Sequence, residues 1–228
     1  RSISAVELNL LAGWRDPPID FDTPLSARLS LALGADGGLE NASGRFSAGA
    51  GFFYIKDPDH EPLPVDEVSG GFRWDVAARR FQVEPTQFHS GRTHLVFAGR
   101  LTPPESAMGS WALSLESGAG LFGSERPGEG DIAVARTELE ARLSLSQKAF
   151  WIDRFSLEGP DLSFAMSGEG RLNDGARRLS LNAQSLNTSA KTLVRLWPSP
   201  IAPHVRAYLL AHVLEGRLAK AAMNVELD

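Results

Sequence analysis

The sequence contains no cysteine, no long hydrophobic run and no excess of positive charge. The absence of cysteine excludes disulfides, thiolate zinc sites and a cysteine nucleophile. No apolar run approaches the roughly 18–20 residues of a membrane-spanning helix, and no signal peptide is recognisable. The net charge of −5 provides no electrostatic attraction to nucleic acid or to anionic lipid surfaces. With 43% hydrophobic and 22% charged residues, the 228-residue chain is instead typical of a globular protein with a sizeable core.

The common catalytic and cofactor motifs are also missing. There is no G-x-S-x-G elbow, no P-loop, no G-x-G-x-x-G after a strand and no H-E-x-x-H. His89 and His94 flank a glycine turn and can meet on a hairpin. Because no cysteine or acidic residue lies between them, we interpret them as surface histidines rather than as metal ligands. Glu138 and Glu140 alternate with apolar residues and are typical of a solvent face. We therefore predict no catalytic residue, no metal and no cofactor, and hence no enzyme.

Apolar and polar residues alternate with a period of two along most of the chain. Leu139, Ala141 and Leu143, for example, are interleaved with Glu138, Glu140 and Arg142. This pattern predicts strands with one apolar and one wet face, as in antiparallel sheets. Turn-forming segments such as 34–38 separate the strands. The sequence therefore predicts a mainly β protein with about ten antiparallel strands.

Two segments share an order of features. Residues 79–101 and 148–172 each contain an aromatic-apolar strand, a glycine-containing turn, an alternating strand and a Gly-Arg-Leu sequence. This faint repeat suggests hairpin units laid side by side.

Helix is expected only at about residues 189–215. Thr188 or Ser189 can cap a first helix, Pro203 suits the first position of a second, and Gly216 is the expected stop. An apolar stripe with helical spacing predicts that the second helix packs on the sheet as a plug. The residues expected to form this helical plug are Trp197, Tyr208, Leu209 and Val213.

The same segment carries a family resemblance. Trp197-Pro198, Ala202-Pro203, Arg206, Tyr208, Leu214 and Gly216, followed by a strand, resemble the signature of AsmA-like proteins, particularly their YhdP-type branch. The resemblance covers residues 188 to 227, and Tyr208 stands where the family has a tryptophan. Those proteins are envelope proteins of Gram-negative bacteria, anchored in the inner membrane, and are implicated in phospholipid movement between the two membranes. The resemblance implies an extended, curved antiparallel sheet that forms an open, apolar groove.

Composition alone favours a closed β-sandwich core, whereas the resemblance favours the open groove. On the groove interpretation, residues 1–228 form a single β-groove segment excised from a longer periplasmic protein that is anchored to the inner membrane. The expected partner is phospholipid, bound by its acyl chains. Envelope proteins are a second class of expected partner. Contact with the membrane is expected from parts of the full-length protein outside this chain. The residues expected to line the groove are Leu95, Phe97, Leu143, Leu145, Phe164 and Met166.

Two alternatives belong to other functional classes. The first is a structural β-module that scaffolds envelope assembly and binds protein partners through a sheet edge. The second is a carbohydrate-active β-sandwich enzyme, which would need converging carboxylates in a cleft. Lipid found with the purified protein would favour the groove over the scaffold.

Overall fold

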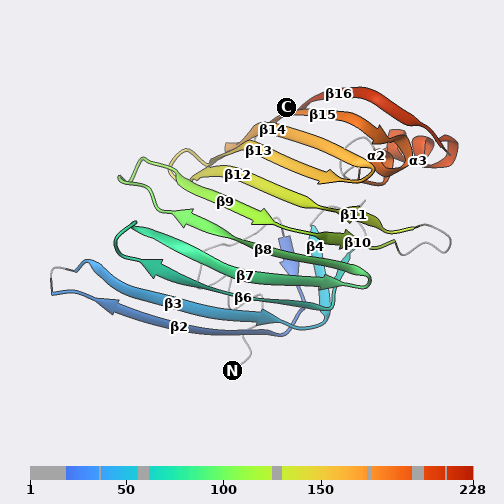
Figure 1. Ribbon diagram of the computed structural model, residues 1–228. Helices are drawn as coiled ribbons and strands as arrows, with labels where there is room; N and C mark the ends of the chain where they lie inside the picture. Colours follow the sequence, from blue (N-terminus) through green and yellow to red (C-terminus); the bar gives the residue numbers. More distant parts are fainter. Residues whose placement is uncertain are drawn as a thin grey trace.

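The computed structural model describes residues 19–35, 37–55, 62–124, 130–173, 176–196, 203–213 and 215–227. Most of these residues lie in two antiparallel sheets, one of 13 strands and one of three (Figure 1). The predicted fold class is confirmed: the protein is mainly β, with one extended antiparallel sheet that does not close and two short helices near the C-terminus.

The large sheet follows chain order with few exceptions. Its long strands, in spatial order, are β2 (Leu25–Leu33), β3 (Leu39–Ala48), β6 (Glu67–Asp75), β7 (Arg80–Ser90), β8 (Thr93–Thr102), β9 (Trp111–Ser117), β12 (Arg136–Ser144), β13 (Ala149–Gly159), β14 (Leu162–Asn173), β15 (Ala176–Ser189) and β16 (Arg217–Leu227). Because β2 and β16 stand at opposite ends of this order, the sheet is open.

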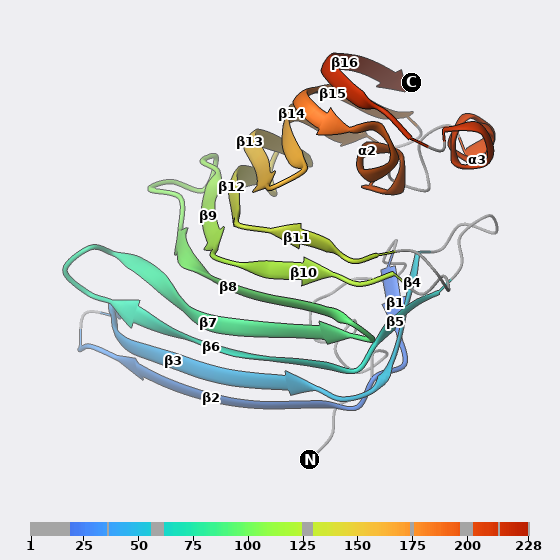
Figure 2. The same cartoon turned by 45° about the vertical axis from the view of Figure 1, so that its right-hand side comes forward.

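Five short strands lie at one end of the long ones. Two belong to the large sheet, β10 (Gly120–Phe122) and β11 (Ile132–Val134), and three form the small sheet, β1 (Ile19–Phe21), β4 (Gly51–Ile55) and β5 (Leu63–Val65). They continue long strands around a corner, β3 into β4, β5 into β6, β9 into β10 and β11 into β12. Figure 2 shows β1, β4 and β5 rising across the ends of the long strands, and β10 and β11 running on beside β8. These five short strands are called here the wall of the trough, and the long strands its floor.

The corners keep their backbone hydrogen bonds to the neighbouring strand. Asp66 N–H donates to the carbonyl of His89 (2.9 Å), and Ala135 N–H donates to that of Glu158 (2.7 Å). The chain can therefore turn from floor to wall without leaving these backbone groups unpaired.

The two similar sequence segments fold as the same hairpin unit, β7–β8 and β13–β14. Each unit follows a four-residue turn that ends at a residue with positive φ, Arg79 (50°) or Lys148 (48°). In each, the register then shifts at a β-bulge, between Val83 and Thr86 or between Ile152 and Phe155. A bulge adds one residue to a strand and increases its twist, so the repeated bulges contribute to the curvature of the trough.

The helices are α2 (Ala190–Leu196) and α3 (Pro203–His212), joined to β15 and β16. The Ser189 hydroxyl accepts a hydrogen bond from the N–H of Thr192 (3.4 Å), as expected of an N-cap. Pro203 is the first residue of α3, and Gly216 (φ 134°) precedes β16. The predicted start of the second helix thus agrees with the structure. The predicted glycine stop does not, because α3 ends at His212, four residues before Gly216.

The second helix does not cover the sheet as expected. α3 lies beside α2, and its Tyr208 is 62% exposed, with its ring stacked on the His212 imidazole (centroids 4.1 Å apart). The assignment of Tyr208 to a buried plug is therefore wrong. The physical reason is that α2, which buries Ala190 and Val194, lies between α3 and the sheet.

Gly99 on β8 provides a test of the close packing of the floor. A Cβ at this position would collide with the backbone carbonyl oxygen of Ser114 on β9, whereas a Cβ at Gly118 meets open space. We predict that Gly99→Ala lowers the free energy of unfolding by about 1–3 kcal/mol. Gly118→Ala is expected to be neutral or stabilising by less than about 1 kcal/mol. Urea unfolding measures both, and equal effects would contradict the close approach of β9 to Gly99.

Candidate functional site

One face of the large sheet, called here the trough face, carries mostly apolar side chains from edge to edge. Directly opposed residues of an antiparallel pair point to the same side, so the register traces rows of side chains across the sheet. One such row crosses all the long strands: Leu29, Gly44, Phe72, Val83, Gly99, Leu115, Leu139, Phe155, Met166, Ala183 and Met223. At about 4.8 Å per strand, the ten steps of this row cover roughly 48 Å.

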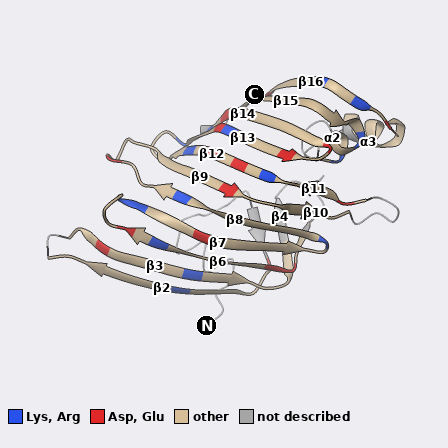
Figure 3. Cartoon of the chain, in the orientation of Figure 1, with Lys and Arg blue, Asp and Glu red and all other residues tan. Residues whose placement is uncertain are grey.

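The opposite face is polar in the same systematic way. A neighbouring row on that face holds Ser30, Ser43, Arg73, Gln82, Arg100, Ser114, Glu140 and Arg154. Figure 3 shows charged residues recurring along the long strands. The charges of this row therefore lie on the face away from the trough, and the apolar row that runs through the trough contains none.

The trough face is open toward β2. Leu29, Leu31 and Leu33 of β2 are 66%, 58% and 60% exposed, and Leu143 on β12 is 46% exposed. A sandwich core would bury such side chains, because each leucine gains about 1.5–3 kcal/mol from leaving water. Large contiguous apolar surfaces of this kind mark binding sites for apolar partners or ligands.

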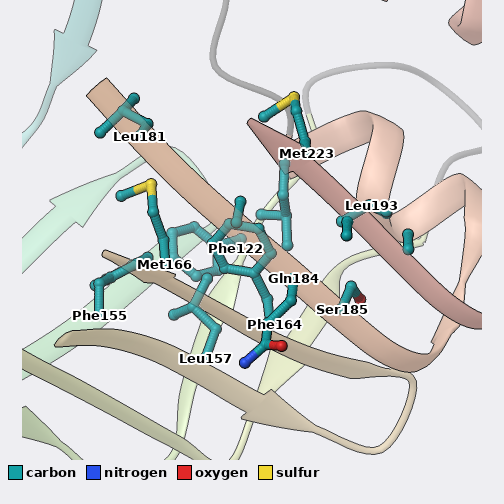
Figure 4. Close-up of a pocket in the computed structure, with 14 residues that line it drawn as sticks. Phe122, Phe155, Leu157, Phe164, Met166, Leu181, Gln184, Ser185, Leu193 and Met223 are labelled. Carbon is teal, nitrogen blue, oxygen red and sulfur yellow. The ribbon is translucent and has the colours of Figure 1, made fainter. Parts of the chain in front are cut away.

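Toward β16 the same face is roofed by α2 and forms a pocket of about 340 Å³. Figure 4 shows side chains from the floor and from the helix converging on it. Its lining consists of Phe122, Phe155, Leu157, Phe164, Met166, Leu181, Ala183, Gln184, Ser185, Leu193, Leu196, Ala221, Ala222 and Met223. No charged residue contributes, and Gln184 and Ser185 are the polar members of this set.

The base of the pocket is firmly packed. Leu157 (5% exposed) lies in a buried cluster with Ile132, Val134 and Leu162. Phe155 and Phe164 meet edge to face, with ring centroids 6.3 Å apart and planes at 70°. Aromatic pairs prefer this arrangement, which fixes both rings and so shapes the pocket.

The buried hydroxyls near the pocket are paired with one another. The Ser185 hydroxyl donates to Thr188 Oγ1 (2.7 Å) or to the carbonyl of Ser163 (2.8 Å). The fully buried Thr188 hydroxyl also accepts from the N–H of Ser163 (2.9 Å). Since these groups satisfy each other, Ser185 adds little polarity to the pocket.

Five of the six residues predicted to line a groove lie on the trough face. Phe97 and Phe164 stand in one row through Ser117, Thr137 and Leu157. Leu95, Leu143 and Met166 lie on the same face, and Phe164 and Met166 also line the pocket. Leu145 does not belong to this set: β12 ends at Ser144, and Leu145 begins the turn to β13.

The predicted plug residues are divided. Trp197 lies outside the described residues. Leu209 and Val213 are half-buried, and neither lines the pocket. Leu193 and Leu196 of α2 cover it instead, so the plug role belongs to the first helix rather than to the apolar stripe of the second.

Several lining residues were not predicted. Phe155 and Leu157 follow the Asp153-Arg154 pair, where the bulge adds a residue and shifts the alternation. That charged pair, placed between Ile152 and Phe155, is the signal that reveals them. Phe122 lies in a strand of only three residues, which is too short to show an alternating pattern.

The two histidines meet, but without further ligands. His89 and His94 are directly opposed on β7 and β8, with their rings stacked 4.2 Å apart. Among the described residues, no group of three or more His, Cys, Asp and Glu side chains is placed to hold a metal ion. Glu138 forms ion pairs with Arg136 (2.5 Å) and Arg154 (3.3 Å) on the polar face.

Arg142 and Asp153 form a bidentate ion pair on the same face (2.7 and 2.6 Å). The hydrogen bond from Arg142 lowers the pKa of the Asp153 carboxyl. A lowered carboxyl pKa stabilises the fold above the unfolded value of about 3.9, and this contribution is lost as pH falls through the folded value. We predict that Asp153→Asn costs about 0–1 kcal/mol at pH 7, since both side chains are partly exposed, and almost nothing at pH 3. Urea unfolding of both proteins at the two pH values measures the difference.

Comparisons with protein-family models, curated proteins and solved structures find no match to this chain. In the part of the chain that the structure describes, no helix is long and apolar enough to cross a membrane. The candidate site is therefore defined by its own geometry: an apolar trough face with a roofed pocket at one end.

Proposed function

We propose that this chain is a non-enzymatic lipid-handling segment that holds phospholipid acyl chains along its trough face. The full protein would be an inner-membrane-anchored periplasmic protein that carries phospholipid between the inner and outer membranes. The family resemblance of residues 188 to 227 supports this setting. The trough face supports the binding role independently of that resemblance.

The observation that carries the proposal is the uncharged apolar row from Leu29 to Met223. An acyl chain is recognised by exclusion from water, which is worth about 0.8 kcal/mol per buried CH₂ and has no directional requirement. A continuous apolar row offers similar contacts at each step, so a chain can slide along it without crossing a large barrier. The polar head group would remain in water at the open side of the trough.

The roofed pocket supplies a more enclosed site within that track. Its volume of about 340 Å³ falls within the range of about 300–1,000 Å³ that is usual for small-molecule sites. Met166 and Met223 give its wall flexible, polarisable side chains that adapt to ligands of varied shape. An acyl chain end fits this chemistry.

A scaffold role is the second candidate, and one observation favours it. β16 is the outermost strand at its end of the described sheet, and its 11 residues offer a long edge for pairing with another strand. Such a module would bind protein at the edge and would leave the trough empty.

Organic extraction and native mass spectrometry of the purified protein test the proposal. We expect phospholipid to co-purify with it, and added long-chain fatty acid to displace that lipid. Protein that is folded, free of lipid and unable to bind added fatty acid would favour the scaffold.

A further inference from the structure

The helix that roofs the pocket, α2, follows a hairpin unit at the same point in the chain as β10 follows the preceding unit. After the first hairpin unit, the chain leaves β9, forms the wall strands β10 and β11, and returns as β12. After the second unit, it leaves β15, forms α2 and α3, and returns as β16. Both insertions lie at the same end of the long strands (Figures 1 and 2). α2 thus stands where the preceding unit has a strand pair.

The strand wall is joined to the sheet by its backbone. β10 pairs with β11 and, at Leu121, with His94 of β8. The N–H of Gly123 donates to Thr93 Oγ1 (3.0 Å), and Arg92 forms an ion pair with Asp131 (2.5 Å). Displacing this wall would break ladder hydrogen bonds.

The helical roof, α2, is held differently. A helix satisfies its backbone groups internally, so α2 contributes few of them to the sheet. Its contacts with the trough are made by apolar side chains. Leu193 and Leu196 line the pocket, and Leu196 also packs against the buried cluster that contains Leu157. Arg195 Nη1 also donates to the carbonyl of Gly130, two residues before β11 (2.7 Å). Displacing α2 would break side-chain contacts but no ladder hydrogen bonds between strands.

The backbone on both sides of the insertion has unusual torsions. Asn187 (φ 46°), near the end of β15, and Gly216 (φ 134°), just before β16, both have positive φ. The N–H of Ala190 donates to the Gly216 carbonyl (2.9 Å), which holds the two ends of the insertion together. Such element-terminal residues are where hinge motion is usually absorbed.

From this difference we infer that α2 is a movable roof. When α2 moves aside, an acyl chain enters or leaves the pocket from the side. The Arg195–Gly130 hydrogen bond acts as its latch. This inference rests on the proposed function for its cargo, but the motion of α2 is a separate property of the fold.

A cross-link across the latch tests the inference. The chain has no cysteine, so Gly130→Cys with Arg195→Cys creates a unique pair. A Cβ at Gly130 meets open space, so this substitution should be tolerated. A short bismaleimide then ties α2 to the strand wall. We expect uptake of a fluorescent long-chain fatty acid to slow by about tenfold or more. When the cross-link is added after loading, release should slow to a similar extent.

Two controls separate the possible causes. The same double variant before cross-linking should take up the probe at least as fast as the parent, because the latch is lost. Ser30→Cys with Ser43→Cys, directly opposed on the polar face of β2 and β3, should show no change in uptake when cross-linked. Equal uptake with and without the Gly130–Arg195 cross-link would overturn the inference that α2 is a movable roof. Absence of binding in the uncross-linked protein would instead count against the proposed function.

Hydrogen exchange tests the motion without any ligand. We expect the amides of α2 to exchange faster than those of the paired strands β13 and β14, because α2 opens locally while the ladder stays intact. Protection of α2 equal to that of β13 and β14 would overturn the inference whether or not the probe binds.

Discussion

Leu157→Ala is expected to lower the free energy of unfolding by about 2–5 kcal/mol, the cost of emptying a well-packed leucine site. Leu157 is 5% exposed and lies where floor, wall and helix meet, in contact with the cluster of Ile132, Val134 and Leu162. Thermal unfolding measures the effect, since each kcal/mol lowers Tm by about 2–4 °C in a domain of this size.

Leu31→Ala is the matched control. Leu31 lies on the same trough face, in the alternating sequence of β2, but is 58% exposed. Its truncation should change the free energy of unfolding by less than about 0.5 kcal/mol. If both leucines were equally costly to truncate, the trough face would be a closed core along its whole length. The open trough would then be wrong.

Met166→Glu is expected to weaken fatty-acid binding by about a hundredfold, because a bound acyl chain would have to cover the carboxylate or leave the pocket. Met166 stands in the apolar row and lines the pocket beside Phe155. Met166→Leu preserves volume and apolarity, and should bind with little change. Fluorescence titration with a long-chain fatty acid measures all three proteins.

Met108→Glu provides the control for added charge. Met108 lies between β8 and β9 and is 68% exposed, away from the pocket. Binding by this variant should equal that of the parent. Unchanged binding by a folded Met166→Glu protein would show that acyl chains do not use the pocket.

The alternation of the sequence was sufficient to predict the strands and the side on which many residues lie. Phe97 and Leu95, or Phe164 and Met166, are two apart in uninterrupted strands, so the period of two places them correctly. Prediction failed where the period is interrupted. The extra residue in β13 brings both Ile152 and Phe155 to the trough face although they are three apart, and Leu145 leaves the face because the strand ends first.

The helical pair shows a different limit of the sequence. Ser189 and Pro203 predicted where the two helices begin, since a cap and a first-turn proline depend on local backbone chemistry. Which helix meets the sheet depends on packing, and a stripe such as Val205, Tyr208 and Leu209 cannot reveal that α2 lies between it and the floor. The pocket follows from that packing, so its roof was not predictable from periodicity.

Site-specific photo-crosslinking in cells tests the central claim most directly. A benzoylphenylalanine at Phe97 lies on the trough face, whereas one at the adjacent Val96 lies on the polar face of the same strand. If the trough carries phospholipid, irradiation should give a lipid adduct, identified by mass spectrometry, at position 97 and not at 96. Folded protein with no lipid adduct at 97, or with equal adducts at both positions, would contradict the proposed lipid-carrying trough.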